Sequence, residues 1–179
     1  AEIEMALLHR SVSYHTALHF WYQPPRDATD PKPRWVRTTA GRVLFNSILP
    51  PSQWTDLKPA LVEGGRRWWL AELQDERSVR QFEPDSFAIK QLAEQTQSLG
   101  LCIFARRAGP ESGLVVRAFP LGVGIFEDPA SGAANAAIAA FLEETGNLAG
   151  LGRRYTVSQG REIGRDAVLT LEIDANRDV

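Results

Sequence analysis

The segment from Gly122 to Asn147 constrains the fold of this chain more than any other. It reads GVGIFEDPASGAANAAIAAFLEETGN. Between residues 133 and 142 nearly every residue is Ala, Ile, Phe or Leu, and Asn135 is the one polar exception. A helix that is apolar on all sides has to be buried on all sides. We therefore expect one central apolar helix from Asp128 to Thr145, enclosed by the rest of its domain.

Both ends of this predicted helix carry residues that suit helix termini. Asp128 is a good N-cap, because its carboxylate can accept hydrogen bonds from the free N–H groups of a first turn. Pro129 follows at the first helical position, where a missing N–H costs nothing. Gly146 stands where a residue with positive φ commonly ends a helix. The pattern therefore predicts a helix with defined boundaries at both ends.

The predicted first turn is built from small residues, Ser131, Gly132 and Ala133. Small side chains let a ligand approach the backbone N–H groups closely, and the positive end of the helix dipole favours an anion there. The segment therefore predicts an anion-binding turn. The alternative interpretation is that these residues are small only to allow close packing.

The segments around this helix alternate as half-buried strands do. We expect strands at residues 66–73, 99–106, 114–119, 154–158 and 167–173, and two further helices, at residues 75–82 and from Pro84 onward. Residues 108–113 predict a hairpin turn between the second and third of these strands. The fold class that accounts for both patterns is α+β, with a mostly antiparallel sheet curled around the central helix.

Composition excludes several classes of function. The net charge of −2 does not favour nucleic acid or an anionic membrane as a partner, and no apolar run reaches the ~18–20 residues of a membrane span. The single cysteine, Cys102, sits in a strand pattern and predicts a buried thiol. Of the three histidines, His9, His15 and His19, the last two have the i, i+4 spacing that suits a metal on a helix, but no third ligand is apparent. We therefore expect neither a metal nor a cofactor. These features are typical of a cytoplasmic protein.

Three segments carry a resemblance to a known family. EDPASGAAN, which begins at Glu127, resembles the EDPxTGSA signature of the PhzF family of phenazine-biosynthesis-like isomerases. LVVRAFP resembles the strand before that signature, and VSQGREIG, which contains Gln159, resembles the family's QGxxMGRP segment. The resemblance covers roughly residues 54–174. It implies a diaminopimelate-epimerase-like domain and a cofactor-independent isomerase that moves a proton on a small carboxylate-bearing metabolite.

The resemblance also implies roles for individual residues. Asp128 would lie beside the substrate as the catalytic carboxylate, a role compatible with capping the helix. Ser131, Gly132 and Ala133 would bind the substrate, although Ala133 lacks the hydroxyl of the family's serine. Gln159 would line the cleft, whereas Glu127 would be structural or would shape the local field.

The first third of the chain carries a second resemblance. The first residues, from Ile3 to Leu8, predict a helix with a crude apolar face, and residues 24–34 predict a proline-rich loop. The stretch around Gly41 predicts a strand before this residue and a short helix after it. TTAGRVLFNSILP resembles a segment of the β′ subunit of bacterial RNA polymerase, without that subunit's metal-binding motif. We therefore expect residues 1–53 to form an appendage to a PhzF-like C-terminal domain at residues 54–179.

Two family motifs do not occur in the sequence: the S-E-T motif, which carries the general base, and the G-H-P motif. This predicts a chain that lacks the family's N-terminal catalytic half. Two alternatives stay open, a non-catalytic fusion product or remnant, and an RNA-polymerase-associated interaction module. A face left bare by the missing half should be apolar, so we expect self-association, in the form of a homodimer.

Overall fold

The computed structural model describes residues 2–9, 12–16, 34–35, 41–63, 66–108 and 113–173. Its strands form one nine-stranded sheet in the order β2-β1-β9-β8-β7-β6-β5-β4-β3. The strands are β1 (Glu2–His9), β2 (Val12–Thr16), β3 (Arg34–Trp35), β4 (Ala60–Glu63), β5 (Arg67–Glu72), β6 (Leu101–Arg106), β7 (Gly113–Phe119), β8 (Arg154–Gln159) and β9 (Ala167–Glu172). The α-helices that the described residues form are α1 (Arg42–Ile48), α2 (Glu76–Arg80), α3 (Ser86–Thr96) and α4 (Gly132–Glu144). Three short 3-10 helices connect strands and helices: η1 (Pro51–Gln53), η2 (Leu121–Val123) and η3 (Arg161–Ile163).

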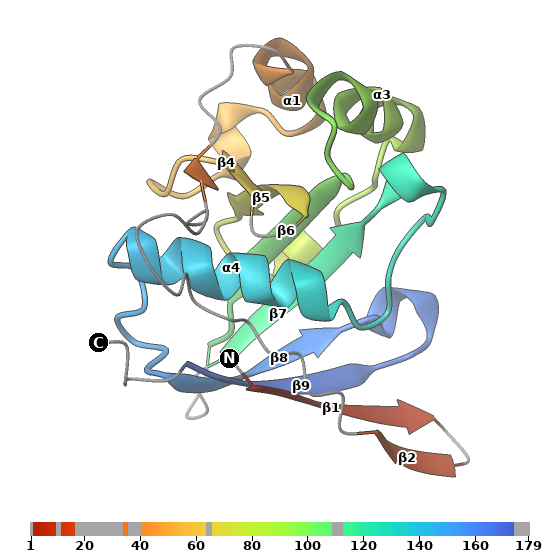
Figure 1. Cartoon of the computed structure of the whole chain (residues 1–179), viewed down its shortest axis with the longest axis vertical. Helices are drawn as coiled ribbons and strands as arrows, with labels where there is room; N and C mark the ends of the chain where they lie inside the picture. The colour runs from red at the N-terminus through yellow and green to blue at the C-terminus, as the bar shows by residue number, and fades with distance from the viewer. Residues whose placement is uncertain are drawn as a thin grey trace, which may run out of the picture.

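The helices cover the sheet because of how its strands are connected. Neighbouring strands are antiparallel except for two parallel pairs, β5–β6 and β7–β8. Parallel neighbours need a crossover connection, and helices normally supply it. Helices α2 and α3 lie between β5 and β6 in the chain, and α4 lies between β7 and β8. The predicted α+β class and the mostly antiparallel sheet are thereby confirmed, and Figure 1 shows α4 lying across the face of β6 and β7.

Alternation along the strands divides the core between the two faces of the sheet. On the α4 face, Phe104 meets Phe141 edge-on, with 6.4 Å between the ring centroids. On the opposite face, Phe45 of α1 stacks on Trp69 of β5 at 4.8 Å. All four rings are buried. Consecutive strand residues point to opposite faces, so β7 sends Val116 toward α4 and Arg117 toward α2.

Helix α4 begins later than its sequence indicates. Its N-cap is Ser131, whose side chain accepts from the N–H of Ala134, so the prediction of Asp128 as N-cap and Pro129 as first helical residue is wrong. The physical reason is a competing interaction. The N–H of Asp128 donates to the carbonyl of Ala118 at 2.9 Å, which keeps residue 128 paired with β7.

The C-terminal boundary of α4 is confirmed. Gly146 has φ +69°, its N–H donates to the carbonyl of Glu143, and the next N–H donates to Leu142. Burial of the helix is less complete than predicted, because Ala133 is exposed and Ala136 and Ala140 are half-buried. One stripe of α4 therefore does not face the sheet.

The first residues also differ from expectation. Glu2–His9 is strand β1, paired with β9 on one side and with β2 on the other, and not a helix. At the opposite edge of the sheet, β3 pairs with β4, and the helix predicted after Gly41 is confirmed as α1. Nearly all of the proline-rich stretch, residues 24–33, lies outside the described residues. No helix in the described ranges is long and apolar enough to cross a membrane.

Candidate active site at the N-terminus of α4

The connection from β7 to α4 sends two consecutive carboxylates to opposite faces of the sheet. Residue 128 is bridged to Ala118 of β7, so the backbone is locally extended there and neighbouring side chains alternate. Glu127 points to the α2 face, where it meets Arg117. Asp128 points to the α4 face. A single extended pair of residues therefore supplies one structural and one candidate catalytic carboxylate.

Asp128 lies beside the start of α4 without capping it. Its side chain is half-buried, and its Oδ1 accepts from the N–H of Ala130 at 3.1 Å. Its negative charge acts electrostatically on the thiol of Cys102 on β6. Burial first, and then the charge of Asp128, raise the pKa of the Cys102 thiol well above its ordinary value. The cysteine is fully buried, which confirms the expectation of a core thiol.

Two backbone N–H groups in the first turn of α4 have no acceptor within the described residues. Ser131 is buried and uses its N–H on the side-chain oxygen of Gln159 at 3.3 Å. The N–H groups of Gly132 and Ala133 meet no acceptor within the described part of the chain. Free N–H groups at a helix N-terminus bind anions well. The structure thus brings Asp128 and two open donors to one place.

Gln159 lies between β8 and the loop before α4. Its side chain is fully buried, and its Nε2 donates to the carbonyl of Asp128 at 2.7 Å. Asn135, one turn into α4, donates to the Oε1 of Gln159 at 2.8 Å. Substrate contact by Gln159 stays a prediction, whereas its bonds to the loop before α4 are visible. The signal for Asn135 was present in the sequence, as the lone polar residue of the apolar helix.

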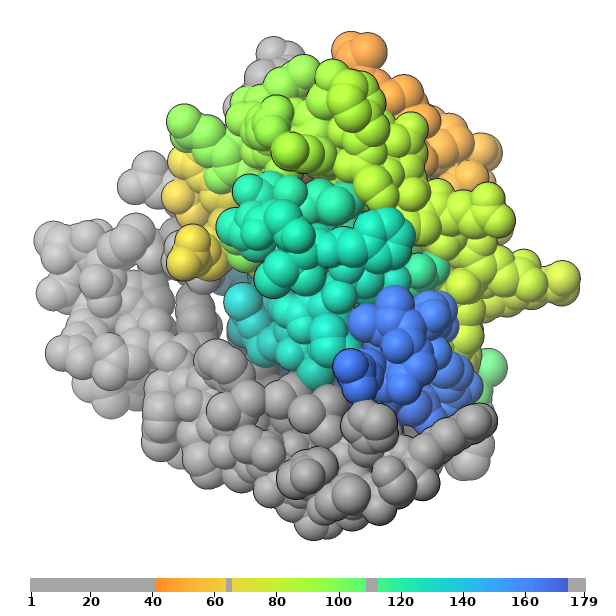
Figure 2. Space-filling view, turned by 90° about the vertical axis from the view of Figure 1, so that its right-hand side faces the viewer, coloured from red at the N-terminus to blue at the C-terminus, as the bar shows by residue number. Residues whose placement is uncertain are grey.

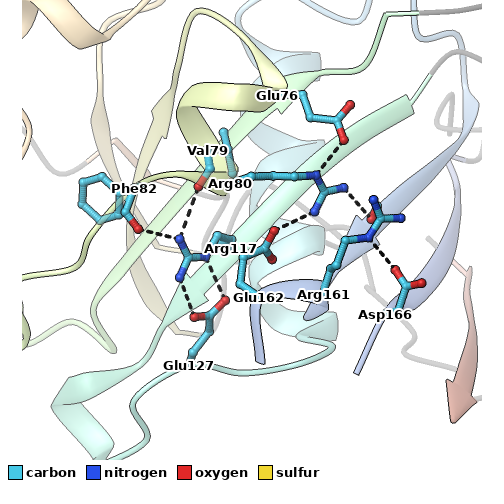
Figure 3. Close-up of polar contacts among 10 residues, drawn as sticks. Glu76, Val79, Arg80, Phe82, Arg117, Glu127, Arg161, Glu162 and Asp166 are labelled. Atoms are coloured by element: carbon cyan, nitrogen blue, oxygen red, sulfur yellow. Dashed lines mark hydrogen bonds and ion pairs between the residues drawn. The ribbon is translucent and has the colours of Figure 1, made fainter. Parts of the chain in front are cut away.

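A buried ion pair anchors the same loop from the other face of the sheet (Figure 3). The Nη2 and Nε of Arg117 donate to the two carboxylate oxygens of Glu127 at 2.8 and 3.0 Å. Nη1 of Arg117 donates to the carbonyl of Phe82, just beyond α2, at 2.6 Å. The structural role predicted for Glu127 agrees with this geometry. Arg117 itself was not singled out, although an arginine within an apolar strand pattern was a usable signal.

A second arginine ties α2 to the connection between β8 and β9. Arg80 donates to Glu76 at 2.7 Å, to Glu162 at 2.8 Å and to the Oγ of Ser158 at 3.0 Å (Figure 3). The same connection includes Gly160, which lies against Pro129 in the loop before α4. Gly160 has φ +82°, and a Cβ there would lie 2.6 Å from the carbonyl oxygen of Pro129.

A surface hollow of about 730 Å³ lies on the α2 side of this loop. It is lined by charged residues of both signs and by Phe82, Phe126 and Ile163. Figure 2 shows this face, where yellow-green, turquoise and blue segments meet. Four large apolar side chains are exposed along these segments: Val123, Ile125, Phe126 and Ile163. The surface on this side of the loop is therefore partly apolar, and Phe126 and Ile163 belong to both the hollow and the exposed apolar set.

Metal-ligating residues do not gather here. Within the described residues, no three of the histidine, cysteine, aspartate and glutamate side chains are grouped so as to hold a metal ion. The backbone of His9 lies in β1 and that of His15 in β2, while His19 lies outside the described residues.

Solved structures with a similar fold include a phenazine biosynthesis protein of the PhzF family from Bacillus anthracis. The likeness has a TM-score of 0.58 at 13% identity and covers 79% of this chain and 56% of that protein. A predicted epimerase from Pseudomonas aeruginosa matches with a TM-score of 0.51 at 17% identity, over 79% of this chain and 54% of that one. Both likenesses concern the fold.

Among curated proteins, antisense-enhancing sequence 1 of Schizosaccharomyces pombe is 23% identical over 118 residues, which is 66% of this chain and 39% of that protein. The chain thus spans about half or less of the length of the proteins it resembles.

The polymerase resemblance of residues 1–53 is not supported. The profile of the phenazine biosynthesis-like protein family, PhzC-PhzF, matches residues 27–179 and so extends into that segment. The chain belongs to the PhzC-PhzF family of phenazine biosynthesis-like proteins.

Proposed function

We propose that this chain supplies one wall of the active site of a cofactor-independent isomerase, which binds a small carboxylate-bearing substrate at the N-terminus of α4. The observation that carries the proposal is the pair of open N–H groups at Gly132 and Ala133 beside the carboxylate of Asp128. The substrate carboxylate would accept from these two N–H groups. Asp128 would then exchange a proton with a carbon atom of the same substrate. Ser131 would contribute mainly by capping the turn.

Moving a proton on a carbon skeleton needs a base to remove it and an acid to return it, and Asp128 would be one of these groups. The second would come from another wall, because the chain spans about half of the related structures. The exposed apolar side chains of Val123, Ile125, Phe126 and Ile163 support a partner surface on the α2 side of the loop before α4. We propose a homodimer for the isolated chain, and light scattering at micromolar concentration would refute it by finding a monomer.

Binding and chemistry can be tested separately. In an ¹⁵N-labelled sample titrated with sodium acetate, we expect the amide resonances of Gly132 and Ala133 to shift more than others. In D₂O, a panel of small carboxylic acids with an acidic C–H is screened for deuterium uptake. Any exchange should disappear in Asp128→Asn, which keeps the Oδ1 that accepts from Ala130. Asp85→Asn is the matched control, because Asp85 caps α3 away from the site.

These two measurements also separate the isomerase from a non-catalytic remnant. Acetate-induced shifts together with exchange that depends on Asp128 support the isomerase. Exchange that persists in Asp128→Asn would remove Asp128 from the reaction. A protein that neither binds carboxylates nor gains thermal stability from them would be a remnant, which the absent S-E-T and G-H-P motifs also favour.

A further inference from the structure

The buried amides of Asn135 and Gln159 form a pair whose position bears on the proposed site. Both side chains are fully buried, one on α4 and one on β8. The Nδ2 of Asn135 donates to the carbonyl of Ser131 and to the Oε1 of Gln159, each at 2.8 Å. Both neighbours are acceptors, so the orientation of the Asn135 amide is determined. Turning it over would place its oxygen against two oxygens.

Gln159 connects this pair to both ends of the loop before α4. Its Oε1 also accepts from the N–H of Ser131 at 3.3 Å, and its Nε2 donates to the carbonyl of Asp128 at 2.7 Å. One side chain therefore holds residue 128, which carries the candidate catalytic carboxylate, and residue 131, where the anion-binding turn begins. The next residue, Gly160, packs on Pro129 between them.

The buried pair of Asn135 and Gln159 does not maximise the stability of the fold. The Oδ1 of Asn135 is buried and finds no hydrogen-bond partner among the described residues. An unpaired buried acceptor costs stability, whereas an apolar residue of similar shape at the same place would avoid that cost. The other positions of α4 between residues 133 and 142 are all apolar. The hydrogen bonds of the amide to Ser131 and Gln159 therefore account for it better than packing does.

We infer that Asn135 and Gln159 are positioning residues, which set the direction of the open N–H groups of Gly132 and Ala133 relative to the carboxylate of Asp128. This inference rests on the proposed function. In this role the two amides act on the loop rather than on a substrate, since both side chains are fully buried. It acts by fixing the loop from residue 128 to residue 131 against β8. Without it, the turn and the carboxylate would move independently.

The test uses Asn135→Leu and Gln159→Met, which keep approximate side-chain size and remove the bonds. In the acetate titration, we expect each variant to bind at least about tenfold more weakly than the unmodified chain. The control is Thr96→Val, which removes buried hydrogen bonds to Trp69 and Leu92 on the other face of the sheet. It should lose stability but keep its acetate affinity. Variants at 135 and 159 that bind within twofold of the unmodified chain would overturn the inference.

A second readout needs no ligand and separates this inference from the proposed function. The ¹³Cγ resonance of Asp128 and the amide resonances of Ala130 and Ser131 report the loop directly. We expect them to move in both variants and not in Thr96→Val. If the unmodified chain does not bind acetate, the proposed function fails, and these resonances still decide the positioning role. Resonances that stay unchanged in both variants would refute it.

Discussion

Removing either member of the ion pair between Arg117 and Glu127 should destabilise the chain severely. The two side chains are 6% and 1% exposed, and they share two hydrogen bonds of 2.8 and 3.0 Å. Arg117→Met leaves the Glu127 carboxylate buried without its partner and frees the carbonyl of Phe82. Breaking a buried pair in this way costs about 3–5 kcal/mol. Glu127→Gln should cost a similar amount, because it leaves the guanidinium uncompensated.

The double variant Arg117→Met/Glu127→Met removes both charges, so it measures the net contribution of the ion pair without leaving one buried charge unpaired. Charges about 4 Å apart attract by ~4 kcal/mol at an effective dielectric constant of 20, and the cost of desolvating both charges offsets much of this. The double variant should therefore lose less stability than either single one. Urea unfolding followed by tryptophan fluorescence measures all three, with Arg117→Lys as a milder variant if a single one does not fold. Additive losses, or single losses below about 1 kcal/mol, would refute the reasoning.

Three further predictions concern the loop and the core beneath it. Ser131→Ala should cost about 1 kcal/mol in chemical denaturation, and Asp128→Ala clearly less, because the N-cap of α4 is Ser131 and not Asp128. Gly160→Ala should destabilise by more than ~1 kcal/mol, since φ is +82° and the new methyl group meets the Pro129 carbonyl; a loss within error in thermal melting would contradict this. The pKa of Cys102 is raised in the fold, so at high pH the unfolded chain releases the proton first. Stability should therefore fall above about pH 8.5, by up to ~1.4 kcal/mol per pH unit, and Cys102→Ala should remove this slope in denaturation curves at pH 8–10.

Elements that depend on local pattern were predictable from the sequence. The hairpin of β6 and β7 follows from two apolar runs around a turn, and the predicted pairing is antiparallel as observed. The end of α4 at Gly146 follows from the need for positive φ after a helix. In both cases the determining contacts lie within a few residues of one another. The family signature added the candidate location of the site, at the start of the apolar helix.

Features that depend on distant contacts were not predictable in the same way. Residues 2–9 have apolar side chains that suit either a helix or a strand. Pairing with β9 stabilises the strand. The start of α4 moves from Asp128 to Ser131 because Ala118 takes the N–H of residue 128. The burial of Gln159 depends on Asn135, 24 residues away. None of these partners can be identified from the sequence beside them.

The loop before α4 is held from both faces of the sheet, and this explains how its N–H groups can stay open. Helix N-termini normally satisfy their free donors by side-chain caps. Here Ser131 caps one donor, at Ala134, and its own N–H is taken by Gln159. The donors that remain, at Gly132 and Ala133, would be lost if the loop folded back over them. Arg117 holds the loop from the α2 face through Glu127, and Gln159 holds it from the α4 face, so we expect both contacts to oppose such a movement. Two donors without a partner beside Asp128, on the buried Gly132 and the exposed Ala133, are the feature on which the proposed anion site rests.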